Sequence, residues 1–248
     1  MQKDCVKQRL VGCPPIFWIN LERSTERKER LSSLFEEYSL INYRVPAVDG
    51  LERDYFLESY KLDPRLSLLE NATTVSHLLA IKKFYNSGAP IGIIMEDDVS
   101  FDFIPYWGKK LTEYINSAPP EWEILQLCYI IPNSMEMKNI LMSAQSEWLN
   151  RSEFYFSALA YVIKREVAAA LLQKFPLEHL DLYMPGQSSA ADCLLYNNAK
   201  TFTFHKCLFT YPENNNSTIH GNHLQMHKES KEFAKQQWIM ESMSNQMQ

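Results

Sequence analysis

Glycine is scarce in this chain, with only 7 glycines in 248 residues. Loops that cradle phosphate groups with backbone amides depend on closely spaced glycines. The scarcity therefore argues against a nucleotide site built on a glycine-rich loop. It leaves open a site in which another group neutralises the phosphates.

Cysteine is uncommon as well, and its spacing forms no motif. The five cysteines are an odd number and include no C-x-x-C pair. This pattern argues against a disulfide framework and against a cysteine-based zinc site.

Long apolar runs and an excess of basic charge are also missing. The N-terminus has no apolar core of signal-peptide length, and runs such as Ile91–Met95 are far too short to span a bilayer. Lys and Arg number 25 against 30 Asp and Glu, which gives a formal charge of −5. Because general nucleic-acid binders carry a basic excess, we expect no nucleic-acid partner. We also expect no transmembrane segment in this ordinary, soluble globular composition.

The first fifty residues carry the pattern of a strand–helix–strand unit. The apolar run Ile16–Ile19 predicts a buried strand. Apolar residues at helical spacing after Ser24, a suitable N-cap, predict a helix, and Tyr43–Val48 predicts the next strand. This order is typical of an α/β fold.

Further along, apolar patterns and turn residues predict the remaining elements. We expect strands at Ile91–Met95, Trp122–Ile130, Phe154–Ile163 and Thr201–Phe209, and helices at Thr74–Tyr85, Tyr106–Asn116, Glu166–Lys174 and His227–Ser242. Residues 51–70 and 131–153 lack a clear period, so we expect a surface excursion and a long loop or lid there. The predicted organisation is a tail over 1–13, one α/β domain over 14–222 and a C-terminal amphipathic helix over 223–248.

Three adjacent carboxylates, Glu96-Asp97-Asp98, follow the most apolar predicted strand. Ligands of open α/β sheets collect at the carboxyl ends of strands. Like charges repel one another, and a bound cation relieves that repulsion. Oxygen donors of this kind suit Mg²⁺ or Mn²⁺. The alternative is a solvated acidic turn, and the triplet alone does not decide between the two.

Two arginines, Arg23 and Arg27, stand near the start of the helix that follows the first predicted strand. The N-terminus of a helix is positive, so this position favours an anion such as a diphosphate. The alternative is a capped surface helix with paired charges.

Other polar residues have an ordinary structural explanation beside a functional one. Ser76-His77 lies in an apolar helix, where a lone histidine is more often a hydrogen-bonded core residue than a ligand. Asp192 precedes an apolar helical segment, so it either caps that helix or acts as a base, and Asp181 lies nearby in the sequence. The late histidines do not show zinc-motif spacing: His205, His220, His223 and His227.

Taken in order, several segments resemble glycosyltransferase family 25, which includes bacterial lipopolysaccharide glycosyltransferases and the procollagen galactosyltransferases. The matching segments run from residue 16 to residue 196: IFWINLERSTERKERL, VPAVDG, VSHLLAIKKF, PIGIIMEDDVSF, EWEILQL, ALAYVIKREVAAALL and AADCLLY. Each segment is a weak signal alone, whereas the ordered set is specific.

The resemblance implies a GT-A fold, which is a Rossmann-like α/β sheet that binds a nucleotide sugar, usually a UDP-sugar. Glu96-Asp97-Asp98 stands where the family has its DxD-like motif. This implies Asp98 and Asp97 as ligands of Mn²⁺ or Mg²⁺, Glu96 and Asp97 near the ribose or sugar, and His220 as a further metal ligand. The family's nucleotide-side motifs fall on Asn20, Arg23, Asp49, Ser76 and His77.

The family is classed as inverting, which implies that an acceptor hydroxyl displaces UDP in one in-line step. Such a step needs a carboxylate base on the acceptor side. Asp192 matches the family's aspartate before an apolar helix and is the first candidate, with Asp181 in reserve. The implied reaction is a metal-dependent transfer of galactose or glucose from a UDP-sugar to a saccharide or a hydroxylysine-type acceptor.

The chain departs from the family pattern at three places. Leu69 and Ala72 fill positions that are usually glycine, and Ser157-Ala158 replaces a common Gly-Thr. A side chain in place of glycine narrows a pocket where backbone approaches a ligand. The alternative function is therefore a catalytically inactive binding or adhesion protein with the same fold.

The expected location follows from the missing signal peptide, which favours a cytoplasmic enzyme of bacterial or viral origin. Lys228–Trp238 carries basic and aromatic residues that would allow peripheral membrane contact, although an ordinary docked helix is the simpler explanation.

Overall fold

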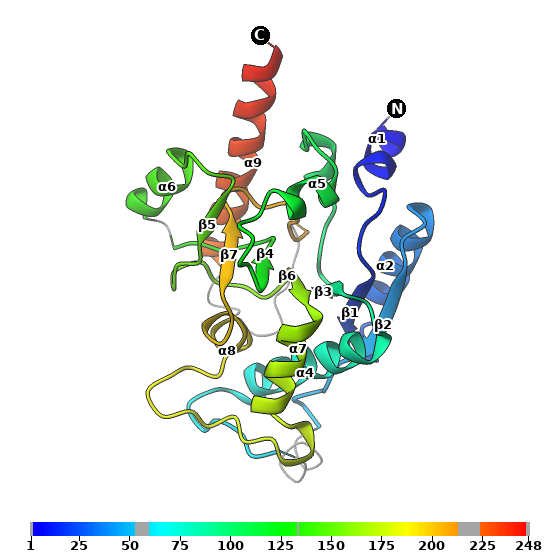
Figure 1. The fold of residues 1–248 in the computed structure, drawn as a ribbon, viewed down its shortest axis with the longest axis vertical. Helices are drawn as coiled ribbons and strands as arrows, with labels where there is room; N and C mark the ends of the chain where they lie inside the picture. The colour runs from blue at the N-terminus through cyan, green and yellow to red at the C-terminus, as the bar shows by residue number, and fades with distance from the viewer. Residues whose placement is uncertain (1, 53–59, 133, 213–223, 247–248) are drawn as a thin grey trace.

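The computed structural model describes residues 2–52, 60–132, 134–212 and 224–246 (Figure 1). Seven strands form one mixed sheet in the order β2-β1-β3-β6-β4-β7-β5. The strands are β1 (Ile16–Asn20), β2 (Asn42–Pro46), β3 (Ile91–Glu96), β4 (Ile124–Gln126), β5 (Trp148–Asn150), β6 (Ala160–Lys164) and β7 (Thr201–Phe204). The α-helices are α1 (Gln2–Arg9), α2 (Thr25–Glu37), α4 (Leu68–Ser87), α5 (Leu111–Asn116), α6 (Met135–Met142), α7 (Arg165–Lys174), α8 (Ala191–Asn197) and α9 (Leu224–Gln246), and two 3₁₀ turns are η1 (Ile104–Tyr106) and η2 (Leu177–His179).

The sheet has a parallel half in which β1 lies between β2 and β3. The chain leaves β1 through α2 to reach β2, and then returns through α4 to β3 on the other side of β1. The strand order therefore reverses between β1 and β3, which is where open α/β sheets bind their ligands. On the far side of β3 the strand β6 runs antiparallel to both β3 and β4.

Alternating side chains of the strands enter two separate cores, because successive residues of a strand point to opposite faces. From β1, Ile16 and Trp18 join the core formed with α2, α5 and α9. Phe17 and Ile19 join the core formed with α4, α7 and α8. The molecule is thus a helix–sheet–helix sandwich around the sheet (Figure 1).

Helix α4 begins six residues earlier than the sequence pattern predicts, at Leu68 rather than Thr74. Ser67 and Glu70 form a capping box, in which Glu70 N–H donates to Ser67 Oγ at 3.2 Å and Ser67 N–H donates to Glu70 Oε2 at 2.8 Å. The helix ends at Gly88, which adopts the left-handed φ of 78° common at helix ends. The early start brings the first two turns of α4 to the cleft described below.

Two segments that we expected to lack regular structure are ordered. Residues 131–153 contain α6 and the edge strand β5 rather than a long loop or lid. The side chains of Met137, Leu141 and Trp148 are buried in the core, and Trp148 Nε1 donates to Tyr114 O at 3.1 Å. The predicted tail over 1–13 contains α1, which buries Val6 in the same core. These three elements are too short to show a clear period in the sequence.

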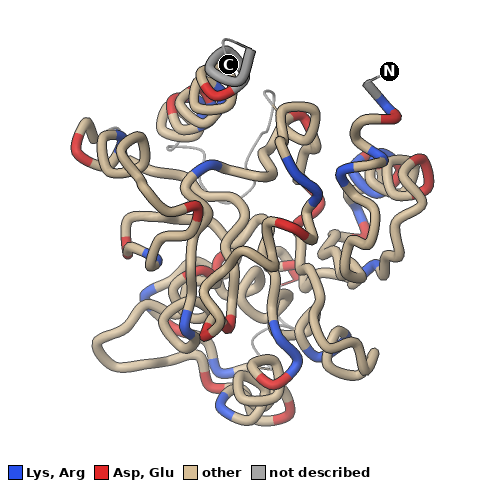
Figure 2. The backbone as a smooth tube through the Cα atoms, turned by 45° about the horizontal axis from the view of Figure 1, so that its top comes forward, with Lys and Arg blue, Asp and Glu red and all other residues tan. Residues whose placement is uncertain are grey.

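The α/β, Rossmann-like fold with a C-terminal helix is confirmed by the mixed sheet and by α9, and this architecture is consistent with the GT-A type. The end of α9 projects from the body, on the same side as the N-terminus (Figure 1). Its Phe233 and Trp238 are buried, which supports a docked helix rather than an aromatic membrane contact. Among the described residues, no helix combines the length and the apolar character needed to cross a bilayer. Acidic and basic residues are interspersed along the described chain (Figure 2).

Candidate functional site

A cleft with two lobes lies at the carboxyl ends of β1 and β3. The larger lobe has a volume of about 350 Å³ and the smaller lobe about 110 Å³. Thr73, Glu96 and Asp98 line both lobes, so the lobes meet at the end of β3. Glu96 is also the register partner of Ile19 in β1, which places this junction at the reversal of strand order.

All three residues of the acidic triplet line the smaller lobe, and Asp97 is also held by two neighbouring side chains. Glu96 ends β3 and Asp98 follows in the turn. Asp97 is buried, and its two carboxylate oxygens accept hydrogen bonds from Asn20 Nδ2 at 2.6 Å and from Arg27 Nη1 at 2.9 Å. The geometry therefore supports a role for Asp97 in holding the turn to β1 and α2. Because both of its oxygens already accept hydrogen bonds, Asp97 is less accessible than Glu96 and Asp98. The role of Asp97 as a metal ligand or substrate contact stays a prediction.

Arg27 lies among the three carboxylates. Burial lowers the pKa of the Arg27 guanidinium, but the negative charges of Asp98, Asp97 and Glu96 outweigh burial and leave the pKa raised. The side chain is thus a permanent cation that already compensates part of the negative charge at the end of β3.

Two further arginines lie nearby, of which Arg30 binds the same turn and Arg23 lies in the wall of the smaller lobe. Arg30, which the sequence pattern did not single out, donates through Nη2 to Asp97 O at 2.8 Å and to Val99 O at 2.9 Å. Arg23 forms an ion pair with Asp49 in the wall of the smaller lobe. As expected, Arg23 and Arg27 lie at the start of α2, and both hold protein carboxylates in this structure.

Asn20 and Ser76 border the smaller lobe, yet their side chains bond to the protein itself. Asn20 is buried, and its Oδ1 accepts from Arg44 Nε at 2.8 Å while its Nδ2 reaches Asp97. Ser76 Oγ accepts from Val48 N–H at 2.9 Å and donates to Ala72 O at 2.7 Å. Both residues hold the walls of the lobe that they line, and their contact with a substrate stays a prediction.

His77 is the fully buried histidine of α4 and bonds on both sides of its ring. Its Nε2 lies 3.2 Å from Glu96 Oε1, and its Nδ1 lies 3.2 Å from Tyr161 Oη. Burial, with a smaller contribution from the charge of Glu96, raises the pKa of Tyr161 well above its ordinary value. The Tyr161 hydroxyl therefore stays protonated and is available as a donor.

Asp192 lies in the first turn of α8 and lines the larger lobe. Its Oδ2 accepts from Ser157 N–H at 3.0 Å, and its Oδ1 accepts from Cys193 N–H at 2.8 Å. Each carboxylate oxygen has two lone pairs, so both oxygens retain capacity for a further donor. Asp192 therefore lines the larger lobe with a carboxylate that can accept a further hydrogen bond, and its role as a base stays a prediction.

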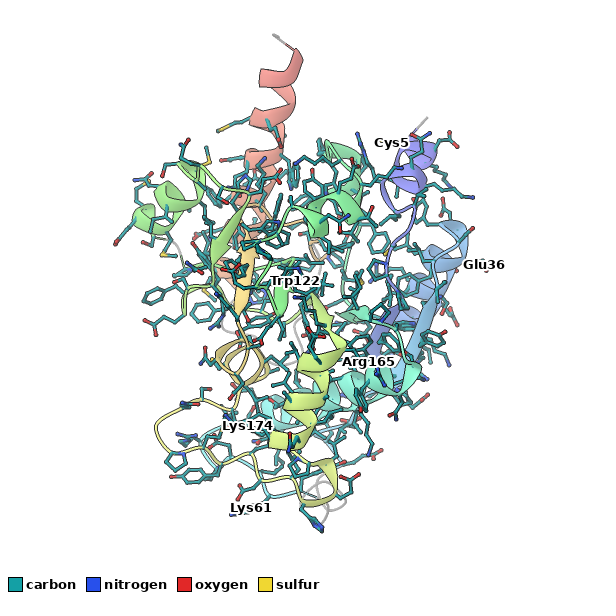
Figure 3. All side chains as sticks on the ribbon, viewed as in Figure 1. Cys5, Glu36, Lys61, Trp122, Arg165 and Lys174 are labelled. Atoms are coloured by element: carbon teal, nitrogen blue, oxygen red, sulfur yellow. The ribbon has the colours of Figure 1, made fainter. Side chains whose placement is uncertain are left out.

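Asp181, the reserve candidate for the base, lies outside both lobes. It forms an ion pair with Lys61, and Figure 3 shows Lys61 at the end of the molecule away from α9. The hydrogen bond from Lys61 lowers the pKa of the Asp181 carboxyl. The structure therefore gives Asp181 a surface role, and it does not bring Asp181 and Asp192 together.

Sequence reasoning missed several residues that line the larger lobe: Glu70, Thr73, Ile130, Phe156, Leu159, Tyr211, Met226 and His227. The Ser67-x-x-Glu70 capping signal would have placed the start of α4 and hence Glu70 and Thr73. Local sequence does not place Tyr211 or His227 at the cleft, because they meet there only when α9 docks against the chain after β7.

The carboxylates at the junction of the lobes suit a hard divalent cation. Glu96 and Asp98 offer oxygen donors, which Mg²⁺ and Mn²⁺ prefer. Within the described part of the chain, no three His, Cys, Asp or Glu side chains gather closely enough to form a complete metal site. Phosphate and water oxygens would therefore complete the ligand set, as is usual for Mg²⁺. His220, expected as a further ligand, lies outside the described residues.

Comparison with known proteins identifies relatives for most of the chain. The model of a family described as Glycosyltransferase family 25 (LPS biosynthesis protein) matches residues 13–184. A protein of Drosophila pseudoobscura pseudoobscura named Glycosyltransferase 25 family member is 30% identical over 186 residues, which cover 68% of this chain and 29% of that protein. A protein of Aedes aegypti with the same name is 28% identical over 193 residues, which cover 71% of this chain and 31% of that protein.

The chain thus spans about three-tenths of the length of these curated relatives. Among solved structures, apo mouse xyloside xylosyltransferase 1 has a TM-score of 0.37 and 9% identity, over 92% of this chain and 88% of that one. The named relatives are insect proteins, so the expectation of a bacterial or viral origin gains no support from them. A cytoplasmic location stays a prediction.

Proposed function

Since this chain belongs to glycosyltransferase family 25, we propose that it transfers a hexose, galactose or glucose, from a UDP-sugar to a hydroxyl group of a glycan or of a hydroxylysine-type acceptor. The observation that supports this most is the junction of two lobes at Glu96 and Asp98. Two lobes that meet at one point suit a reaction that joins two substrates there.

The smaller lobe and the junction form the donor side. Arg23 and Arg27 lie near the N-terminus of α2, where a diphosphate is favoured by the helix dipole and by guanidinium groups. Both arginines are paired with carboxylates, so donor binding competes with those pairs. Mn²⁺ or Mg²⁺ held by Asp98 and Glu96 would stabilise the negative charge that develops on the departing diphosphate.

The larger lobe forms the acceptor side, with Asp192 as the base. The acceptor oxygen bonds to the anomeric carbon while the bond from that carbon to UDP breaks. Asp192 accepts the hydroxyl proton, and UDP leaves with the electron pair. The Ser157 and Cys193 amides orient the Asp192 carboxylate for this transfer.

The lining of the larger lobe also favours a particular kind of acceptor. Apolar side chains such as Ile130 and Phe156 alternate with the carboxylates Glu70 and Asp192, and no Lys or Arg lines the lobe within the described part of the chain. Negative charges repel an acidic ligand. We therefore expect an acceptor without phosphate or carboxylate groups, and with an apolar face.

The test is a UDP-release assay with UDP-galactose and UDP-glucose, with Mn²⁺, and with neutral saccharides or an end-capped hydroxylysine peptide as acceptors. Asp98→Asn and Asp192→Asn are each expected to lower kcat about 100-fold or more, because each removes a charge that the reaction needs. Asp102→Asn is the matched control, since Asp102 is exposed and lies outside both lobes. Wild-type activity in the Asp98 variant, or activity indifferent to chelation of Mn²⁺, would contradict the proposal.

The competing function is a binding or adhesion protein that retains the fold without catalysis. Leu69 and Ala72, which replace family glycines, both line the smaller lobe, whose 110 Å³ is below the roughly 300 Å³ typical of ligand pockets. Calorimetry with UDP and Mn²⁺ separates the two functions. Absence of UDP binding by the folded protein would favour the competing function.

A further inference from the structure

We propose that His77 is a positioning residue that fixes the orientation of the Glu96 carboxylate at the junction of the two lobes. The inference rests on the proposed function, because Glu96 is placed there at the donor. It differs from the direct nucleotide contact that the family motif implied for His77. The side chain of His77 is only 1% exposed, and both of its ring nitrogens are engaged.

Tyr161, His77 and Glu96 form a chain of hydrogen bonds, called the relay below, in which the donors and acceptors can be assigned. An ionised carboxylate only accepts hydrogen bonds, so in a neutral imidazole Nε2 carries the proton that faces Glu96 Oε1. Nδ1 is then the acceptor for the Tyr161 hydroxyl. The chain of bonds therefore runs from Tyr161 through His77 to Glu96, and each donor has one acceptor.

Rigid elements hold all three residues. His77 lies in the interior of the 20-residue helix α4, and Tyr161 lies in β6, opposite Ile94 of the neighbouring strand β3. The rings of His77 and Tyr161 are 5.8 Å apart, and Tyr196 packs edge-on against Tyr161 at 6.0 Å. Glu96 is consequently held from the core of the molecule and not from a loop.

The hydrogen bond from His77 restricts the rotamers of the Glu96 side chain. Its side chain is 29% exposed and borders both lobes, where a free glutamate would sample several rotamers. A histidine that anchors one carboxylate oxygen reduces this sampling before any ligand binds. Hydrogen bonds that orient a ligating side chain typically contribute 10- to 100-fold to metal affinity or activity.

The chain offers a pair of variants that separates the two ring nitrogens. In His77→Gln the amide nitrogen replaces Nε2 and keeps a donor for Glu96. In His77→Asn the shorter side chain places its amide nitrogen near the position of Nδ1, and the hydrogen bond to Glu96 is lost. His205→Gln and His205→Asn are the matched controls, because His205 is a half-buried histidine that bonds through Nδ1 to Glu147 O at 3.0 Å and lines neither lobe.

Three readouts apply to the full chain. Thermal unfolding reports whether each variant folds, and Mn²⁺ electron paramagnetic resonance with UDP reports metal binding. We expect His77→Asn to weaken Mn²⁺ binding about tenfold or more while His77→Gln stays within about threefold of the wild type. In the wild type, ¹⁵N spectra of labelled histidine are expected to show the Nε2–H tautomer, and Tyr161→Phe is expected to shift the His77 Nδ1 resonance.

These measurements separate a failure of the relay from a failure of the proposed function. A wild type that binds Mn²⁺ and UDP without transferring sugar contradicts the proposed function, while the Gln–Asn difference still supports the relay. Equal Mn²⁺ binding by two folded His77 variants overturns the relay, as does an Nδ1–H tautomer in the wild type. The spectra of the wild type decide the matter even if a variant fails to fold.

Discussion

Ser157 has the least ordinary backbone among the residues that line the larger lobe. Its φ of 93° is in the left-handed region, which a side chain normally disfavours. Its amide donates to Asp192 Oδ2, and its carbonyl accepts from Tyr196 Oη at 3.1 Å and from Gln126 Nε2 at 3.0 Å. The surrounding hydrogen bonds therefore hold the strained residue in place beside the Asp192 carboxylate. Glycine, which is common in the family at this position, adopts this φ without a steric cost.

Comparison of Ser157→Gly with Ser157→Ala measures this strain. Both variants lose the hydroxyl that accepts from Leu159 N–H at 3.1 Å, and only glycine relieves the φ. We expect the glycine variant to have a free energy of unfolding about 1 kcal/mol higher than the alanine variant. Urea unfolding of the two variants side by side provides the measurement. An alanine variant that is as stable as the glycine variant would show that the backbone is not strained.

One buried carboxylate, that of Asp63, joins the segment before α4 to the loop before α8. Asp63 is buried and accepts from Arg65 Nε at 2.8 Å and from Ser189 Oγ at 2.8 Å. Arg65 also donates to Met184 O at 2.9 Å. The segment before α4 is thereby tied to the loop that leads into α8, so this network indirectly places Asp192.

The network predicts an acid-dependent loss of stability. The hydrogen bond from Arg65 holds the pKa of Asp63 well below its ordinary value, despite the opposing effect of burial. A carboxyl group whose pKa is lower in the folded state stabilises the fold above its unfolded pKa of about 4, and this contribution disappears as the pH falls toward the folded pKa. We expect Asp63→Asn to lower the free energy of unfolding by about 1–3 kcal/mol at pH 7. The amide group replaces one of the two carboxylate oxygens that accept from Arg65 and from the buried Ser189.

Urea unfolding of the wild type and of Asp63→Asn between pH 7 and pH 2 tests both statements. The difference in unfolding free energy between the two proteins should shrink below about pH 4. Asp181→Asn is the control, since Asp181 forms an exposed ion pair with Lys61 and is expected to have the smaller effect. A difference that does not change with pH would refute the role of the Asp63 charge.

The elements that the sequence predicted well are those whose pattern is local. The strand at Ile91–Glu96 and the helix after Ser24 appear almost as expected, because each shows its period within its own length. The sequence also predicted a cluster of carboxylates at one strand end, since Glu96 and Asp98 stand at the end of the most apolar strand. Asp97 was not separable from them, because its partners Asn20 and Arg27 lie 77 and 70 residues away in the sequence. Only the folded sheet brings these partners to the turn.

The same reasoning explains the missed part of the larger lobe. Met226 and His227 lie on the first turn of α9, whose register against the body is fixed by contacts far from the cleft. Tyr211 Oη donates to His227 O at 2.6 Å, which joins the chain after β7 to that turn. No spacing within α9 indicates this arrangement.

At the scale of the whole molecule, α9 packs against the core, and its buried Trp238 anchors the helix there. Trp238 is buried, and its Nε1 donates to Cys207 O at 2.8 Å. The Lys206 ammonium lies 4.8 Å from the centre of the indole ring and pairs with Glu241 at 2.5 Å. One helix therefore closes the core beside β7 and also supplies part of the wall of the larger lobe.

We expect Trp238→Ala to lower the free energy of unfolding by about 3–5 kcal/mol, because it leaves a large cavity and an unpaired carbonyl. Trp238→Phe should cost less, since it keeps an aromatic ring, and Met240→Ala is the control because Met240 is 51% exposed on the same helix. Urea unfolding measures the losses, and methyl resonances of Met226 report the wall of the cleft. If α9 acts as one rigid element, the Met226 resonance shifts in Trp238→Ala and not in Met240→Ala. An unchanged Met226 resonance in a folded Trp238→Ala protein would show that the wall of the larger lobe does not depend on this anchor.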